Sequence, residues 1–398
     1  MSSGLILVLL VASSFVAAHF AFERLGKRYL IVSGAEYLAL GILLGPQVSG
    51  IFTPALLDSL AAFPALALGW MGAIVGMRFY LPELVRIPAF TYRIALTESL
   101  LTIAVVFALE AVAFMWLFDI SLLLATPPAL ALAAIAVSSS RETYEIVSRH
   151  FGEGTFVTQL DVSTAVNAFV AVLTFGCLLA AFHMNPTGAA RPLTATEWVV
   201  LTAAIGLIGG ALFHLFLGGE ANIDRLFVAL AGALILVSGA AAYLGLSPLL
   251  AALFFGFMLV NTSRNRIEIA AALTRVERPL YFVLLIFAGA TWQPSLRAWV
   301  APVLLFVFAR AAAKIGAARL SARAERSLPL LGADWGRALL GQGGIAVALG
   351  IDYLQQEHFA FTHVVFTAVV ASVLLTDMSS ARLARSVFAS VPESDGAA

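Results

Sequence analysis

The feature that most constrains this chain is a succession of long apolar stretches. Windows of about 17 to 25 residues, long enough to cross a ~30 Å hydrocarbon layer, recur along the sequence. We place thirteen of them near residues 4–21, 29–47, 56–77, 91–116, 121–140, 157–182, 197–217, 226–243, 246–261, 279–293, 299–319, 335–354 and 360–380. The sequence therefore predicts an all-α polytopic membrane protein with about thirteen transmembrane helices.

Composition agrees with this class and disfavours others. Hydrophobic residues make up 61% of the chain and charged residues 12%, whereas soluble domains carry about 25% charged residues. The 23 acidic and 23 basic residues balance, so no net field attracts nucleic acid. The single cysteine cannot form an intramolecular disulfide. We find no phosphate-binding loop, no catalytic Ser-His-Asp pattern and no typical metal-binding histidine pair, so we expect no enzyme, no cofactor and no metal beyond an alkali cation.

The distribution of lysine and arginine predicts the orientation. If the N-terminus is outside, eighteen of the 23 basic residues fall on inside segments and two fall outside, as the positive-inside rule requires. An odd number of helices then places the C-terminus in the cytoplasm. We expect one transmembrane domain over residues 1–385 and a short cytoplasmic tail over 386–398.

Two segments interrupt their apolar windows with helix-weakening residues. Ser138–Ser140 lie deep in the fifth window, and Gly341-Gln342-Gly343-Gly344 lie deep in the twelfth. Glycine weakens helices and serine hydroxyls can bond freed carbonyls. Two interrupted helices in corresponding positions of two halves indicate inverted repeats around a midplane binding site. The alternative is that these small residues only allow close helix packing.

Several stretches, in order, resemble one family of transporters. They are EYLALGILLGP at 36–46, LSPLLAALFFGFMLVN at 246–261, RVERPLYFVLLIFAGATWQP at 275–294, AKIGAARL at 313–320 and RALLGQGGIAVALG at 337–350. Over nearly its whole length the chain is similar to bacterial monovalent cation:proton antiporters, the sodium/proton exchanger and Kef-type superfamily.

This resemblance implies a homodimer in the bacterial inner membrane that transports Na+ or K+ and H+. It also implies thirteen helices, divided into a dimerisation domain and a mobile core in which two broken helices cross. In such antiporters the helix after the first broken helix carries an Asp-Asp or Asn-Asp pair, whose second member binds cation and proton alternately. Here Asn167 matches the first position and Ala168 the second, so the essential aspartate is missing.

Other residues could replace the missing carboxylate. Neutral oxygen ligands are available from Asn167, Ser139 and Ser140, together with backbone carbonyls of the broken helices. Asp161 is the nearest acid, two turns before Ala168 on the same helical face. Alternatively, Asp161 lies near the cytoplasmic end of its helix and is solvated.

Charges after the serine run give a second departure from the family. A buried pair between Arg141 and Glu142, Glu145 or Asp161 could occupy the position of a cation. The alternative is that the helix ends earlier and that Arg141 and Glu142 face the cytoplasm.

Lys314 resembles the lysine of an Ala-Lys-x-x-Gly motif in the electrogenic branch of the family, although one residue is missing before the glycine. Its implied partner is Asn167, which has no charge, so Lys314 could carry the proton itself. Arg310, one turn earlier, would oppose its protonation. Alternatively, both cations snorkel or pair with distant carboxylates. Among the intramembrane acids Glu36, Glu98, Glu110 and Asp352, Glu98 is a possible compensating acid.

Three functions are consistent with these patterns. The first is cation:proton exchange by elevator-like movement of the core. The second is a transport-inactive or repurposed relative, acting as a membrane scaffold or subunit. The third is transport of an anion or a neutral solute, since Arg141, Arg310 and Lys314 outnumber the nearby acids if Asp161 is solvated.

Overall fold

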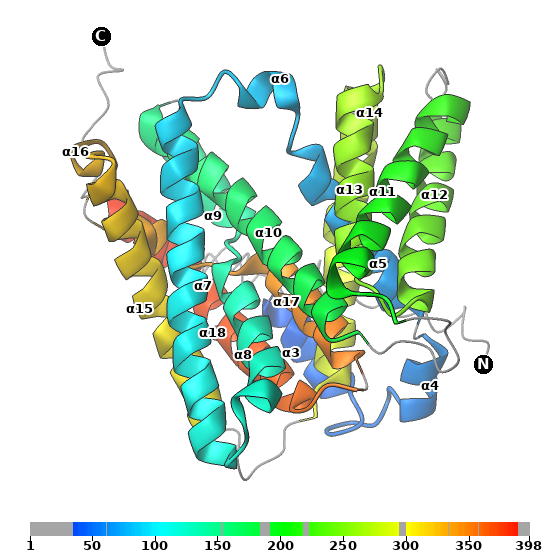
Figure 1. The fold of residues 1–398 in the computed structure, drawn as a ribbon, viewed down its shortest axis with the longest axis horizontal. Helices are drawn as coiled ribbons and strands as arrows, with labels where there is room; N and C mark the ends of the chain where they lie inside the picture. The colour runs from blue at the N-terminus through cyan, green and yellow to red at the C-terminus, as the bar shows by residue number, and fades with distance from the viewer. Residues whose placement is uncertain are drawn as a thin grey trace. The chain divides into compact units, whose positions relative to one another are not determined.

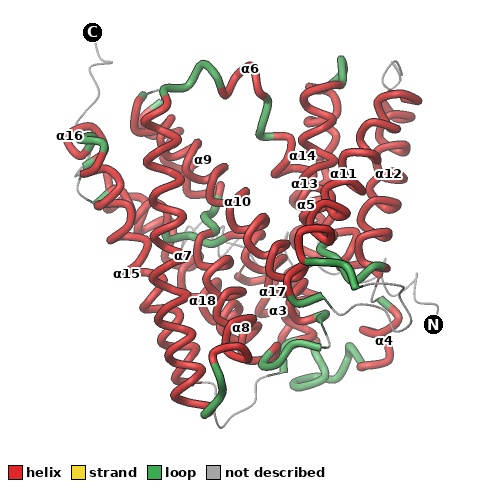
Figure 2. Tube along the Cα trace, in the orientation of Figure 1, coloured by secondary structure: helices red, strands yellow, loops and turns green. Residues whose placement is uncertain are grey.

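The computed structural model describes residues 35–60, 62–152, 154–183, 192–217, 223–293, 300–332, 334–356 and 358–388. Within these ranges the chain forms sixteen α-helices and one 3-10 helix, with no strand (Figures 1 and 2). This confirms the prediction of an all-α fold.

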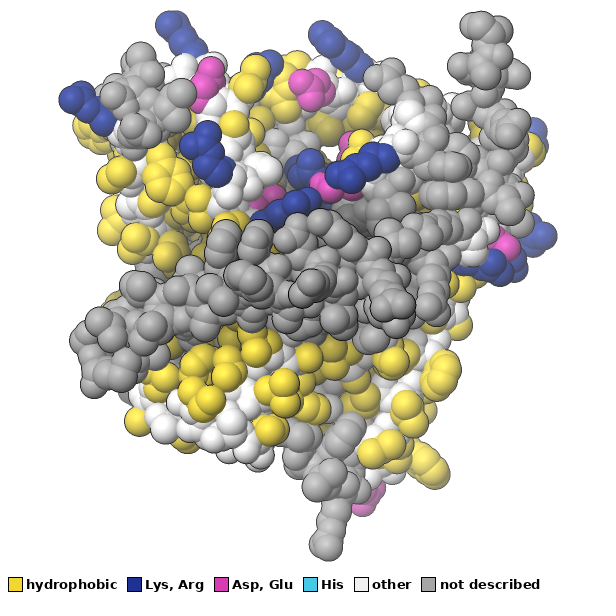
Figure 3. All heavy atoms as spheres, turned by 180° about the vertical axis from the view of Figure 1, so that it is seen from behind, with side chains coloured by type: hydrophobic (Ala, Val, Ile, Leu, Met, Phe, Trp, Pro, Cys, Tyr) yellow, Lys and Arg dark blue, Asp and Glu magenta, His cyan; other side chains and the backbone are white. Residues whose placement is uncertain are grey.

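Five of the described helices are long and apolar enough to cross a membrane. They are Ala89–Phe118, Thr155–Ala181, Ala195–Phe216, Arg225–Tyr243 and Val300–Ala324. Large apolar side chains are also exposed on several helices, among them Val112 and Trp116 on the first and Phe216 on the third. Exposed apolar side chains lie close together over parts of the surface in Figure 3, as expected of protein surface that contacts lipid rather than water. The count of thirteen stays a prediction, and its first window, 4–21, lies outside the described residues.

The chain divides into two compact units, each assembled from separate segments. Among the described residues, the first unit comprises those within 35–59, 88–171 and 282–388, and the second comprises those within 60–87 and 172–281. The single transmembrane domain expected over 1–385 stays a prediction. The last described helix continues to Phe388, slightly past the end predicted for that domain.

The second unit is built around α13 (Pro248–Thr262). This helix packs against α5 (Ala62–Met77), α11 (Ala195–Leu217) and α12 (Ile223–Tyr243), while α6 (Leu81–Leu84) follows α5. The α5–α13 contact depends on glycine, because a Cβ on Gly72 or Gly256 would collide with a backbone carbonyl of the facing helix. Small residues therefore set the separation of these two helices.

The first unit contains the interrupted segments. Its helices are α3 (Ala35–Leu44), α4 (Pro54–Ser59), α7 (Ala89–Phe118), α8 (Leu122–Val137), α9 (Arg141–Phe151), α15 (Val300–Ala324), α16 (Leu328–Leu331), η2 (Trp335–Leu339), α17 (Gly343–Leu354) and α18 (Thr362–Phe388), with most of α10 (Thr155–Ala181). Helix α7 packs against α8 and α15, and α17 packs against α18. Polar residues on these helices are thereby brought together from distant parts of the sequence.

Both predicted helix interruptions are confirmed. Helix α8 ends at Val137 and α9 begins at Arg141, so Ser138–Ser140 form the first break. The 3-10 helix η2 ends at Leu339 and α17 begins at Gly343, so Leu340–Gln342 form the second break. One boundary differs from expectation: residues 266–291 form a single helix, α14 (Arg266–Thr291), which passes through Pro279, although the sequence predicted a span beginning only near residue 279.

Candidate functional site at the two helix breaks

The two helix breaks are bonded directly to each other. The backbone N–H of Ser140 donates to the carbonyl of Gly341 at 2.7 Å, and the Ser139 hydroxyl donates to the carbonyl of Leu339 at 3.0 Å. Gly343 has φ +65°, and a Cβ there would lie 3.2 Å from the Cα of Ser140. The positive φ and the close approach therefore both favour glycine at this position.

Arg310 of α15 joins the two breaks through their carbonyl oxygens. Its side chain is fully buried. One guanidinium nitrogen donates to the carbonyl of Leu340 at 2.7 Å, and another donates to the carbonyl of Ser138 at 3.1 Å. Carbonyls that follow helix ends carry partial negative charge. The guanidinium therefore supplies hydrogen bonds and positive charge where a bound cation could otherwise contact these oxygens.

Asn167 connects the first break to two helices. Its amide nitrogen donates to the Ser139 hydroxyl at 3.1 Å, and its amide oxygen accepts a hydrogen bond from the Ser99 hydroxyl at 2.6 Å. Asn167 is fully buried, and the neighbouring Ala168 is almost completely buried. The position expected to carry the family's pair therefore lies at the break, with its amide hydrogen-bonded on both sides.

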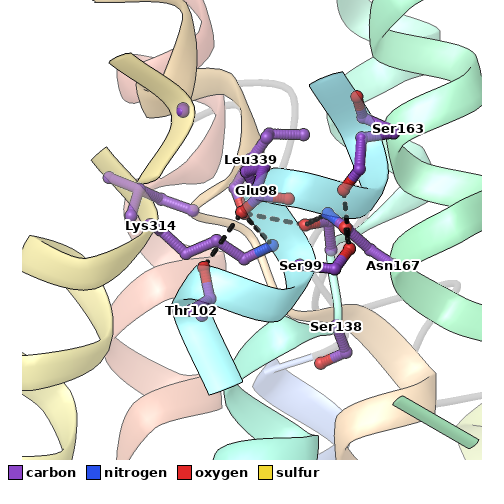
Figure 4. Close-up of polar contacts among 12 residues, drawn as sticks. Glu98, Ser99, Thr102, Ser138, Ser163, Asn167, Lys314 and Leu339 are labelled. Carbon is purple, nitrogen blue, oxygen red and sulfur yellow. Dashed lines mark hydrogen bonds and ion pairs between the residues drawn. The ribbon is translucent and has the colours of Figure 1, made fainter. Parts of the chain in front are cut away.

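A buried ion pair lies beside this hydrogen-bonded chain. The Nζ atom of Lys314 lies 3.0 Å from Oε1 of Glu98, and both side chains are 0% exposed. The Thr102 hydroxyl donates to the same carboxylate oxygen at 3.2 Å. The other oxygen, Oε2, is buried with no hydrogen-bond partner among the described residues. In Figure 4, Lys314 extends from α15 toward Glu98 on α7, and Ser99 lies between Glu98 and Asn167.

The prediction of the partner of Lys314 was wrong. The resemblance implied an uncharged partner, Asn167, whereas the structure pairs Lys314 with Glu98. The reason is the antiparallel packing of α7 against α15, which also brings Arg93 of α7 within 2.7 Å of Glu325, the residue after α15. The alternative in which the lysine pairs with a distant carboxylate is therefore confirmed for Lys314, and Glu98 is that carboxylate.

The structure shows the alternative in which the Arg141 side chain is exposed to solvent. Its side chain is 48% exposed, and its Nε lies 4.0 Å from Oε1 of Glu145, one turn later on α9. Glu145 also lies 4.0 Å from Arg149. Arg141 is thus not buried at the breaks. The side chain of Glu142 lies outside the described residues.

Three other residues expected at the site lie on the same unit. Asp161 is half-buried on α10, about 9 Å along the helix axis from Asn167, and its carbonyl accepts a hydrogen bond from the Thr164 hydroxyl at 2.8 Å. Gln342 is fully buried at the N-cap of α17, and Gly344 lies in the first turn of that helix.

Two residues of the site were missed by sequence reasoning. Ser99 and Thr102 both lie on α7 and bond the site's central residues. The signal available was the cluster of Glu98, Ser99 and Thr102 within one turn of an otherwise apolar helix. Such a cluster places several polar groups on one helical face.

No protein-family model matches the sequence, and no curated protein matches it either. Solved structures do match. The structure of the sodium proton antiporter MjNhaP1 from Methanocaldococcus jannaschii at pH 8 has a TM-score of 0.70 and 14% identity, covering 97% of this chain and 98% of that chain. An electron-microscopy structure of the same antiporter gives a TM-score of 0.70 and 14% identity, covering 96% and 97%. The chain is therefore similar in fold, over nearly its whole length, to a sodium proton antiporter.

Proposed function

We propose that this protein is a secondary transporter that exchanges Na+ or K+ for protons. The observation that carries the proposal is the fully buried Glu98–Lys314 pair, 3.0 Å apart, beside the contact between two broken helices. Ionisable residues inside a membrane are costly and typically mark ion or proton pathways. The fold similarity to a sodium proton antiporter supports the same class of function, although fold alone does not determine function.

Competition for Glu98 provides a mechanism for exchange. Lys314 forms an ion pair with Oε1, whereas Oε2 has no hydrogen-bond partner among the described residues. An alkali cation that binds this carboxylate would compete with the ammonium group for its charge. Lys314 would then lack a counter-charge in a low-dielectric interior and would release its proton. When the cation leaves, Lys314 would take up a proton again and re-form its ion pair with Glu98.

The side-chain oxygens near Glu98 are better placed to bind an alkali cation than the backbone carbonyl oxygens of the two breaks. Asn167 Oδ1 and the Ser99 and Ser139 hydroxyls are neutral oxygen groups in one hydrogen-bonded chain. Arg310 already bonds the carbonyls of both breaks. We therefore propose Glu98, with Asn167, Ser99 and Ser139, as the cation-binding group. Ser140 holds the breaks together, and Asp161 remains a second candidate acid.

Alternating access would follow from movement of the first unit, which contains every residue of this site. We propose an elevator-like movement in a homodimer embedded in a lipid bilayer. The division into two compact units supports a mobile core and a separate dimerisation domain. We retain the expected location in the bacterial inner membrane, with the N-terminus outside and the C-terminus in the cytoplasm.

Proton flux in proteoliposomes tests the proposal. Purified protein is reconstituted with an internal pH dye, and pulses of Na+, K+ and Li+ are applied under an imposed pH gradient. We expect a cation-dependent pH response that Glu98→Gln abolishes. Glu83→Gln is the matched control, since it removes one charge from an exposed acid on a different helix. Asp161→Asn tests the second candidate acid.

Each outcome has a definite meaning. If Asp161→Asn abolishes the cation-dependent pH response and Glu98→Gln retains it, Asp161 rather than Glu98 is the carrier. The absence of any cation response in folded, correctly inserted protein would refute exchange.

A transport-inactive relative is the second candidate. It is favoured by the buried alanine at position 168 and by the guanidinium of Arg310 at the breaks. Under this alternative, Glu98→Gln would change the stability of the protein, and neither the unaltered protein nor the variant would respond to cations. A response to anions or neutral solutes in the same vesicles would instead support the third function.

A further inference from the structure

Glu110 is a buried acid that the proposed exchange mechanism does not use. It lies on α7 three turns beyond Glu98, about 18 Å along the helix axis, and its side chain is 0% exposed. Neither of its carboxylate oxygens has a hydrogen-bond partner among the described residues. Val106 and Phe114, one turn away on either side, are also fully buried. The carboxyl group therefore lies in apolar surroundings inside the protein.

No described charge is positioned to compensate Glu110. Helix α8, which packs against α7, has no ionisable residue between Leu122 and Val137. Helix α15 runs antiparallel to α7. Glu110 lies twelve residues after Glu98, so the residue of α15 at the same level along the axis lies twelve residues before Lys314, which is Pro302. The first cation on α15, Arg310, then lies about 12 Å away along the axis and bonds the helix breaks.

Aromatic residues cover the Phe118 end of this region. The rings of Phe114, Phe118 and Phe361 contact one another, with centroids 4.5 to 5.6 Å apart. Phe361 has φ +61°, which is strained for a bulky side chain. The nearest ionisable residue after it, His363, is exposed. Glu110 thus lies between this aromatic cluster and the Glu98–Lys314 pair.

We infer that Glu110 is a second proton-binding site of this protein, separate from the Glu98–Lys314 pair. An ionised carboxylate without a partner is strongly disfavoured in an apolar interior, whereas the protonated carboxyl carries no charge. An alkali cation would need several oxygen ligands, and no described polar group bonds either oxygen of Glu110. The ligand is therefore a proton. This site does not depend on cation exchange.

Infrared difference spectroscopy tests the inference directly. A protonated carboxyl has a C=O stretching band that a carboxylate and a glutamine lack. At neutral pH we expect the protein to show this band and Glu110→Gln to lose it. Glu83→Gln, the same change on the exposed helix α6, should retain it. Glu110→Asp keeps an acid at the position and should show the band at a shifted frequency, which covers the case in which the glutamine variant does not fold.

Titration distinguishes a proton site from an inert buried acid. The band should shift in D2O and disappear as the pH is raised, while circular dichroism shows that the fold persists. Identical spectra of the protein and Glu110→Gln at neutral pH would overturn the inference, as would a band that persists at every pH at which the protein stays folded. Because the measurement follows one carboxyl group, its result is independent of whether cations are exchanged.

Discussion

Removing one charge of the Glu98–Lys314 pair should destabilise the protein much more than removing both. For unit charges 3.0 Å apart, Coulomb's law with an effective dielectric constant of about 20 gives an attraction of about 5–6 kcal/mol. Leaving one buried charge unpaired typically costs about 3–5 kcal/mol, whereas replacing both charges is often neutral. We therefore expect Glu98→Gln or Lys314→Met alone to cost about 3–5 kcal/mol, and the double variant to recover most of this loss.

The assay is reversible unfolding in mixed detergent micelles with increasing dodecyl sulfate. The unfolding free energies of the protein, the two single variants and the double variant form a double-mutant cycle. Single-variant costs below about 1 kcal/mol, or additive effects in the double variant, would refute a buried ionised pair.

The Arg93–Glu325 pair provides a matched control, because it joins α7 to the residue that directly follows α15. Arg93 is largely exposed there. Its coupling should therefore be small and should weaken with added salt, whereas the coupling between Glu98 and Lys314 should be insensitive to salt.

Three further predictions concern other parts of the first unit. Arg310→Ala leaves two buried carbonyls without their donors, at about 1–3 kcal/mol each, and millimolar guanidinium ion should restore part of the lost thermal stability; an unchanged melting temperature would contradict the assigned bonds. Gly343→Ala forces a side chain into φ +65°, at about 1–2 kcal/mol, and should lower the unfolding free energy more than Gly344→Ala does. The hydrogen bond from Arg93 lowers the pKa of Glu325. The stability contributed by this pair is therefore complete above the pKa of the carboxyl in the unfolded protein and is lost as the pH falls through the lowered pKa of the folded protein. The difference in unfolding free energy between the unaltered protein and Glu325→Gln should shrink on acidification.

The sequence predicted the helical class and both breaks because these depend on local chemistry. Runs of apolar residues predict helices, and the serine run and the Gly341–Gly344 segment disfavour them locally. Asn167 and Ser139, named from sequence as ligands of one site, are hydrogen-bonded to each other.

The partner of Lys314 could not be predicted in the same way. Glu98 and Lys314 lie on helices far apart in the sequence, and apolar windows do not indicate which helical faces meet. Arg141 was also ambiguous, because a helix boundary displaced by a few residues decides whether its side chain is buried or solvated. These assignments depend on tertiary packing, which spacing along one chain does not reveal.

The guanidinium that bonds both helix breaks has a consequence for how ligands bind. The carbonyls of Ser138 and Leu340 are already satisfied by the protein's own cation, so the broken backbone is ordered before any ion arrives. Binding then carries little entropic penalty for organising the chain, since preorganisation lowers the cost of association. Calorimetry of cation binding should accordingly show a small heat-capacity change, in contrast to sites that fold around their ions.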